Sequence, residues 1–168
     1  MKMTDENREF IFNNITRWLR DSNFVISEEK ITVVTSEFYA KAYPQSDHEH
    51  ILEILSSSGN EDHFVLRTRL QVSEQQLGIL EKLGPNEKLK FNDKMDTVIV
   101  PQHQAIAFRD KSVLLEKIIA IDPKSIDSKQ EVIQNVSNLL ESAKKLDVIF
   151  NEFFLNKNRL KKTNQKVA

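Results

Sequence analysis

Residues 64–85 read FVLRTRLQVSEQQLGILEKLGP and predict a strand followed directly by a helix. The first half alternates, and the side chains that share one face are Phe64, Leu66, Thr68, Leu70 and Val72. This two-residue period is typical of a strand with one buried face. Ser73 and Gln76 then match a capping box, which begins a helix through Leu83. Gly84 and Pro85 end it, because glycine closes helices and proline cannot continue them.

The residues upstream predict one helix and two more strands. Residues 4–21 place apolar side chains on one helical face, namely Phe10, Ile11, Ile15, Trp18 and Leu19. Residues 24–43 are rich in β-branched side chains and predict one extended segment, and residues 51–55 predict a second strand. Residues 56–60 have the composition of a turn. Three strands with short connections predict an antiparallel meander.

The residues downstream predict a further strand pair and a long helix. Residues 86–96 fit neither period, whereas residues 98–100, 105–108 and 113–121 predict strands. Residues 128–154 carry an apolar stripe at helical spacing. Residues 157–168 contain basic side chains and no acid, which predicts a flexible tail after a single domain of residues 1–156. The chain is therefore expected to be α+β, with a single antiparallel sheet flanked by N- and C-terminal helices.

Composition excludes several classes of protein. The chain has 168 residues, a formal net charge of −1, three glycines and no cysteine. Without cysteine there can be no disulfide, thiolate nucleophile or cysteine-ligated metal. Three dispersed glycines cannot form a P-loop or a dinucleotide-binding loop. Near-neutral charge argues against a dedicated nucleic-acid binder. No apolar run approaches a membrane span and residues 1–9 do not resemble a signal peptide, so we expect a cytoplasmic protein.

The order of elements resembles the type III secretion chaperone-like fold, written α-βββ-α-ββ-α, and is more closely similar to an uncharacterised archaeal family of that fold. The segments that carry the resemblance are Trp18 and Leu19, residues 64–72 running into 73–83, residues 114–119 before Asp122, and the helix of residues 128–154. The resemblance implies a helix at residues 86–96. It also implies a small homodimer that holds a partly unfolded protein client, and it supplies no catalytic residue and no cofactor.

Histidine and carboxylate side chains gather in one stretch of the sequence. Asp47, His48, Glu49 and His50 follow one another, and His63 lies beyond the next predicted turn. Imidazole and carboxylate groups are ligands of divalent transition metals. One hypothesis is therefore a metal-binding protein or metal-dependent enzyme that uses His48, His50 and His63. The alternative is that these are exposed loop histidines.

Aromatic side chains near the end of the long helix suggest association. Phe150, Phe153 and Phe154 lie where the helix is expected to extend past the sheet, and they can serve either an interface or the core. The main hypothesis is a non-enzymatic protein-binding module, chaperone- or adaptor-like, that captures a partner on a sheet face, in a helix-lined groove or at a sheet edge. Ser56, Ser57 and Ser58 have no base or oxyanion hole at recognisable spacing, so no catalytic residue is assigned and the main hypothesis is not an enzyme. An RNA-associated factor, using Arg67, Arg69 and the basic tail, is a further alternative.

Overall fold

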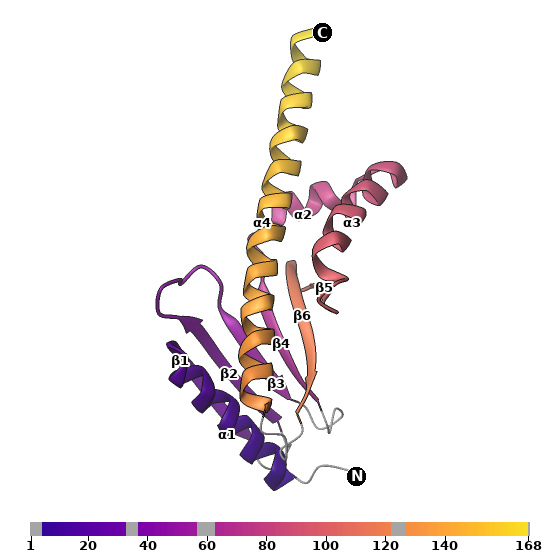
Figure 1. The fold of residues 1–168 in the computed structure, drawn as a ribbon. Coiled ribbons are helices and arrows are strands. Elements are labelled where there is room, and N and C mark those ends of the chain that lie inside the picture. Colours follow the sequence, from indigo (N-terminus) through magenta and orange to yellow (C-terminus); the bar gives the residue numbers. More distant parts are fainter. Residues whose placement is uncertain (1–4, 33–36, 57–62, 122–126, 168) are drawn as a thin grey trace.

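The computed structural model describes residues 5–32, 37–56, 63–121 and 127–167, with side chains for residues 8–157 of these ranges (Figure 1). The elements are, in chain order, α1 (Asp5–Asp21), β1 (Phe24–Thr32), β2 (Glu37–Pro44), β3 (Leu52–Ser56), β4 (His63–Arg69), α2 (Glu74–Glu81), α3 (Pro85–Ile99), β5 (Ala105–Arg109), β6 (Ser112–Ala120) and α4 (Ser128–Val167). No helix in these ranges is both long enough and apolar enough to cross a membrane.

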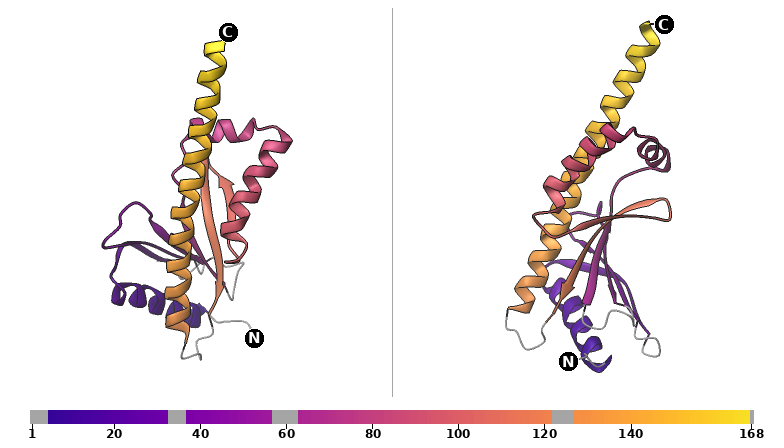
Figure 2. Two further views of the ribbon diagram at one scale, coloured as in Figure 1. Left: turned by 45° about the horizontal axis from the view of Figure 1, so that its top comes forward. Right: turned by 90° about the vertical axis from the view of Figure 1, so that its right-hand side faces the viewer.

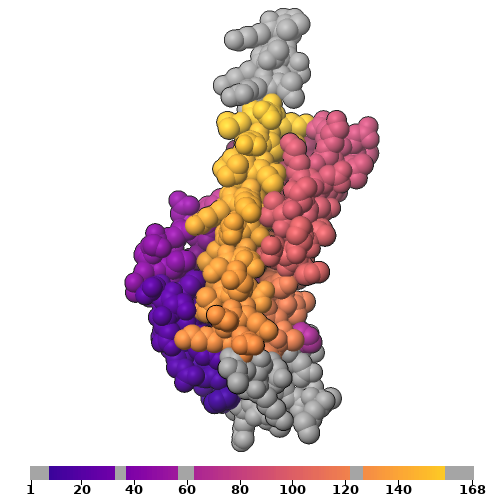
Figure 3. Space-filling view, viewed as in Figure 1, coloured from indigo at the N-terminus to yellow at the C-terminus, as the bar shows by residue number. Residues whose placement is uncertain are grey.

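All six strands form one antiparallel sheet in the order β1-β2-β3-β4-β6-β5. Helix α1 packs on β1 and β2, and α4 packs on β4 and β6 (Figures 1 and 2). The predicted α+β class, with one antiparallel sheet and flanking helices, is therefore confirmed. Figure 3 shows α4 between α1 on one side and the α2–α3 pair on the other.

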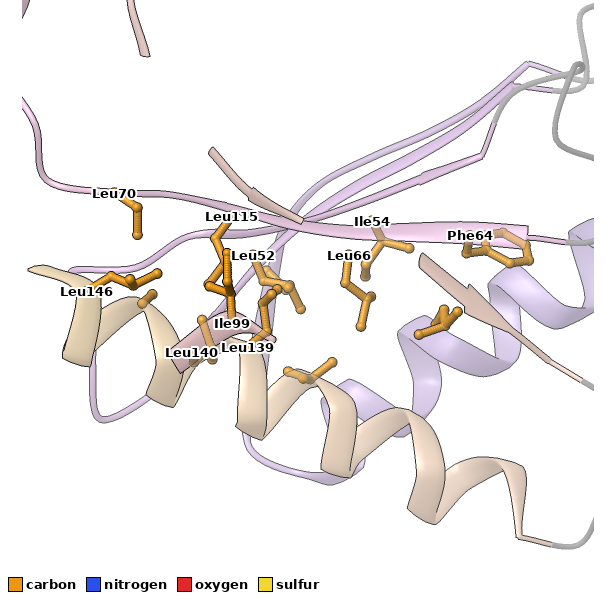
Figure 4. Packing of buried hydrophobic residues seen from close by; sticks show 14 of the residues in the cluster. Leu52, Ile54, Phe64, Leu66, Leu70, Ile99, Leu115, Leu139, Leu140 and Leu146 are labelled. Atoms are coloured by element: carbon orange, nitrogen blue, oxygen red, sulfur yellow. The ribbon is translucent and has the colours of Figure 1, made fainter. Parts of the chain in front are cut away.

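The core lies between the sheet and these two helices. The strands bury alternate side chains, as the pattern of residues 64–70 predicts, and Leu52, Ile54 and Leu66 are fully buried. Figure 4 shows these side chains pointing from the sheet toward α4. Leu139 of α4 is also fully buried. Each such side chain stabilises the fold by about 1.5–3 kcal/mol when it leaves water, so this layer fixes the position of α4 on the sheet.

The structure corrects the prediction of one extended segment at residues 24–43. Strands β1 and β2 pair antiparallel from Phe24 opposite Pro44 to Thr32 opposite Glu37, so the chain reverses between them. Residues 33–36 lie outside the described ranges, as do residues 57–62, which include most of the predicted turn. The sequence Val-Val-Thr-Ser at 33–36 has no glycine, proline, asparagine or aspartate, and strand composition continues across the reversal. Four strands rather than three therefore precede α2.

The prediction of a strand at residues 98–100 is also wrong, because Val98 and Ile99 end helix α3. This helix begins at Pro85, where the fixed φ of proline suits the first turn. Its buried side chains Phe91, Met95 and Ile99 recur every four residues, which is a helical spacing. The helix that the resemblance implied for residues 86–96 is present.

Helix α4 is longer than the 27 residues predicted. It continues to Val167 through residues that the sequence assigned to a flexible tail. Forty residues at 1.5 Å each give about 60 Å, and the C-terminal half extends beyond the sheet (Figures 1 and 2). The sequence from 127 onward contains neither glycine nor proline, so no residue interrupts the helix.

Candidate functional site

An apolar groove lies between the α2–α3 pair and strand β5. Its lining includes Leu77 and Leu80 of α2, Leu83 of the connection, Phe91 and Met95 of α3, and Phe108 of β5. The groove has a volume of about 290 Å³. In the right-hand view of Figure 2, α2 is seen almost end-on above the tip of the β5–β6 hairpin. Three consecutive elements of the chain, α2, α3 and β5, thus meet at one apolar surface.

Local sequence signals hold the walls of this groove in place. The Ser73 side chain accepts a hydrogen bond from the Gln76 backbone N–H at 3.2 Å, and the Gln76 side chain accepts one from the Ser73 N–H at 3.0 Å. The predicted capping box is therefore confirmed. A short connection then leads into α3 at Pro85. On the opposite side, Asp110 and Lys111 adopt φ values of 49° and 60° and return β5 tightly onto β6.

The groove combines buried walls with one exposed ring. Leu77, Leu80 and Met95 are each less than a tenth exposed, whereas Phe108 is 55% exposed. Glu81 and Lys88, both exposed, lie at its margin and make no ion pair within the described ranges. A fixed apolar surface with a projecting aromatic ring and polar margins is the arrangement found at protein-binding sites. Sequence reasoning missed the groove, since Phe108 was recognised only as part of a strand.

The aromatic residues predicted as an interface pack within the chain. Phe150 and Phe154 are buried and Phe153 is partly buried. The Phe91 ring lies 5.1 Å from that of Phe150 and 4.7 Å from that of Phe153, between centroids. An ion pair between Lys157 and Glu87 joins the same two helices. Phe150 and Phe153 therefore pack against Phe91 of α3, which lines the groove, and Phe154 packs against both of them.

The predicted histidine cluster does not come together in the structure. His48 is exposed, its Nε2 lies 3.2 Å from the carbonyl oxygen of Gln45, and its ring lies 4.6 Å from that of Tyr43. His50 is buried just before β3. His63 is exposed at the far end of β4, five residues before Thr68, the partner of Leu52. Five residues of strand span roughly 17 Å, so His63 cannot share a metal ion with His50.

His50 instead pairs with Asp147 of α4, which is 97 residues away in sequence. Its Nε2 lies 2.6 Å from Asp147 Oδ2, and Asp147 Oδ1 accepts a hydrogen bond from the Gln71 backbone N–H at 2.9 Å. This arrangement joins the loop before β3, the connection after β4, and α4. On the same loop, ligand atoms of Asp47, Glu49 and His50 lie within 4.8 Å of one another and are the described side chains best placed to hold a metal ion.

The sheet face opposite α1 and α4 carries a row of alternating charge. Register places five side chains side by side across five strands, namely Glu28, Lys41, Glu53, Arg67 and Glu116. Glu53 accepts hydrogen bonds from Tyr39 Oη at 2.7 Å and from Arg67 at 3.2 Å. Burial opposes the charge on Glu53, but these two hydrogen bonds outweigh it and hold its pKa below the usual range. Burial, together with the hydrogen bond to Glu53, raises the pKa of Tyr39 well above its usual range.

The ion pairs of this charge row argue against nucleic-acid binding on this face of the sheet. A hollow of about 330 Å³ lies over the row and is lined in part by Arg67, Arg109 and Glu116. Arg67 is paired with Glu53, and Arg109 lies 3.5 Å from Glu116. Both guanidinium groups are thus already neutralised by carboxylates, which is unfavourable for contacts to phosphate.

Comparisons with known proteins agree on a family and a fold. The profile of a family described as "Uncharacterized conserved protein (DUF2299)" matches residues 11–167. A crystal structure of an uncharacterized protein from Methanothermobacter thermautotrophicus is similar, with a TM-score of 0.61 and 20% sequence identity over 84% of this chain and 97% of that one. At that identity, the similarity concerns the fold alone. No curated protein shows a significant match.

Proposed function

The chain belongs to the DUF2299 family of uncharacterized conserved proteins, and we propose that it is a non-enzymatic protein-binding module whose α2–α3 groove holds an apolar segment of a protein partner. The observation that carries the proposal is the apolar lining from three elements, with Phe108 55% exposed at its edge. The role is chaperone- or adaptor-like. The resemblance to type III secretion chaperones adds the proposal of a cytoplasmic homodimer.

The small volume and apolar lining of the groove suit the apolar side chains of a chain segment. Small-molecule sites usually occupy about 300–1,000 Å³, and this groove has about 290 Å³ with Leu77, Leu80 and Met95 in its lining. Such a space suits one or two apolar side chains of a peptide. Covering the Phe108 ring removes apolar surface from water and contributes about 25 cal/mol for each Å² covered.

The margin of the groove indicates the chemistry of the segment. Glu81 lies at the end of α2 and Lys88 in the first turns of α3, and both are exposed. A complementary segment is amphipathic, with apolar side chains facing Phe108 and charges of both signs beside Lys88 and Glu81. Such rim charges set specificity and orientation more than affinity.

A site-specific crosslink tests the proposal. A photoreactive phenylalanine analogue replaces Phe108 in one variant and Ile118 in another, and both are expressed in the source cells. Ile118 is the control, because it is 63% exposed and lies on a neighbouring strand at the opposite face of the sheet. We expect a crosslink to one protein partner from position 108 and none to that partner from position 118.

Binding of the crosslinked segment completes the test. The segment is identified by mass spectrometry, synthesised, and titrated against the full chain. We expect Phe108→Thr to weaken its binding at least tenfold and Ile118→Thr to leave it unchanged, since threonine suits a strand in both variants. Equal crosslinking at both positions, a crosslink to RNA or to a second copy of this chain, or an undiminished affinity of Phe108→Thr would overturn the proposal.

A further inference from the structure

The loop that joins β2 to β3 brings three potential metal ligands together. A carboxylate oxygen of Asp47, one of Glu49 and a ring nitrogen of His50 lie within 4.8 Å of one another. Two ligands at 2.0–2.2 Å from one tetrahedral zinc ion are about 3.3–3.6 Å apart, so side-chain rotation, above all of the exposed Glu49, is needed to bring these atoms to that spacing. We propose that Asp47, Glu49 and His50 bind a divalent transition-metal ion such as Zn²⁺.

The buried imidazole of His50 supports the metal site independently of the distances between the three ligands. Its side chain is 3% exposed, and its Nε2 lies 2.6 Å from Asp147 Oδ2. A carboxylate only accepts hydrogen bonds, so Nε2 carries the proton and donates it to Asp147. In the neutral imidazole Nδ1 then keeps its lone pair, and this buried atom has no hydrogen-bond partner in the described part of the chain. An unsatisfied buried nitrogen is costly, and a metal ion would satisfy it.

The hydrogen-bond partner of His50 is a carboxylate, which is the kind of partner that metal-bound histidines commonly have. A ligating imidazole generally donates its second ring N–H to a carboxylate, which fixes the ring and raises its basicity. Asp147 takes this position, and it is itself held by the Gln71 backbone N–H at 2.9 Å. His50 is thus oriented by α4 before any ion binds, which lowers the cost of assembling the site.

The two carboxylates differ in how firmly they are held. Asp47 Oδ1 accepts a hydrogen bond from the Glu49 backbone N–H at 2.9 Å, and Oδ2 lies 3.0 Å from Lys144 Nζ. Both contacts favour the charged form of the Asp47 carboxylate. Glu49 is exposed and can rotate toward the ion. The Lys144 ammonium is 58% exposed and competes with a metal ion for Asp47.

The donor set indicates the class of ion. One imidazole and two carboxylates suit Zn²⁺ and its neighbours in the first transition series better than Ca²⁺ or Mg²⁺, which prefer oxygen ligands alone. Three protein ligands leave at least one coordination position to water. His48, although adjacent in sequence, belongs to a different contact, against Gln45 and Tyr43.

Titration of the untagged full chain with Zn²⁺, and with Co²⁺ as a spectroscopic substitute, tests the site. We expect one ion per chain, a tetrahedral or five-coordinate Co²⁺ spectrum, and a thermal transition raised by Zn²⁺. Glu49→Gln should weaken binding at least about tenfold, and because Glu49 is exposed the variant keeps the fold. Lys144→Ala should strengthen binding by roughly two- to fivefold, the value of one exposed ion pair.

The control is the neighbouring imidazole. His48→Gln removes a histidine one residue from the site and should leave the affinity for Zn²⁺ unchanged. The proposal is overturned by the absence of stoichiometric binding, by an unaltered affinity of Glu49→Gln, or by loss of binding in His48→Gln. These outcomes are independent of the α2–α3 groove, because none of the substituted residues lines it.

Discussion

Replacement of Phe150 by alanine tests whether the aromatic residues of α4 belong to the core. Phe150 is fully buried, and its ring lies 5.1 Å from that of Phe91 and 6.3 Å from that of Phe154. Removal of a buried phenylalanine costs about 3–5 kcal/mol, which includes the cavity that remains. For a chain of this size each kcal/mol lowers the melting temperature by about 2–4 °C, so we expect a fall of about 6–20 °C.

Urea denaturation followed by circular dichroism measures this loss. Leu155→Ala is the matched control, because Leu155 is on the same helix and 57% exposed, and its replacement should change stability by no more than about 0.5 kcal/mol. Light scattering on the same samples gives the mass. If Phe150→Ala unfolds at the urea concentration of the wild type while its mass falls from dimer to monomer, the ring serves an interface between copies, and the reasoning from burial is refuted.

Two further predictions concern the cap of α2 and the charge row. Ser73→Ala removes the capping box and should lower the free energy of unfolding by about 1 kcal/mol in urea titrations, whereas Gln75→Ala, at an exposed position of the same helix, should not. Because the folded pKa of Glu53 lies below its ordinary value of 4.5, its ionised form adds stability above about pH 4.5 that is lost as pH falls further. Because the folded pKa of Tyr39 is raised, its neutral phenol adds stability below pH 10 that is lost above it. Urea midpoints across pH should therefore show Glu53→Gln approaching the wild type in acid and Tyr39→Phe approaching it in alkali; parallel curves would contradict both.

Strands with one buried face were predictable because their burial follows a local period. Phe64, Leu66 and Thr68 are buried and alternate with Val65 and Arg67, as the sequence indicates. The capping box at Ser73 was equally local, since both of its hydrogen bonds join residues three apart. Such features depend on a few neighbouring residues, and tertiary packing here agrees with them.

The buried face of α1 was predicted only in part. Phe10 was predicted on its buried face, but it is 59% exposed, while Phe12 is fully buried together with Ile11 and Ile15. At about 100° per residue, position 12 lies about 60° from the centre of the stripe formed by Ile11, Ile15 and Leu19, whereas position 10 lies about 140° from it, so the helical geometry itself favours burial of Phe12. Phe12 packs against Phe38 and Phe64 of the sheet, whose rings lie 5.4 and 6.4 Å from that of Phe12. Those neighbours are known only once the strands are paired.

The candidate sites were only partly predictable, because their residues meet through the fold. His50 looked like its exposed neighbour His48 until Asp147, far along the chain, was placed beside it. The groove likewise requires α2, α3 and β5 to be positioned before Phe108 can face Met95. In both cases the sequence identifies the side chains, but it does not predict the tertiary contact on which the proposed site depends.

Phe91 links the proposed binding site to the stability of the fold. Its ring lines the groove and is also in contact with Phe150 and Phe153, which hold α3 on α4. A segment bound in the groove would therefore contact the same ring that packs α3 against α4. Since a ligand that binds only the folded state stabilises it, occupancy of the groove should oppose separation of α3 from α4. The aromatic residues that the sequence suggested for association then contribute to it from within the core, by supporting the wall against which the partner packs.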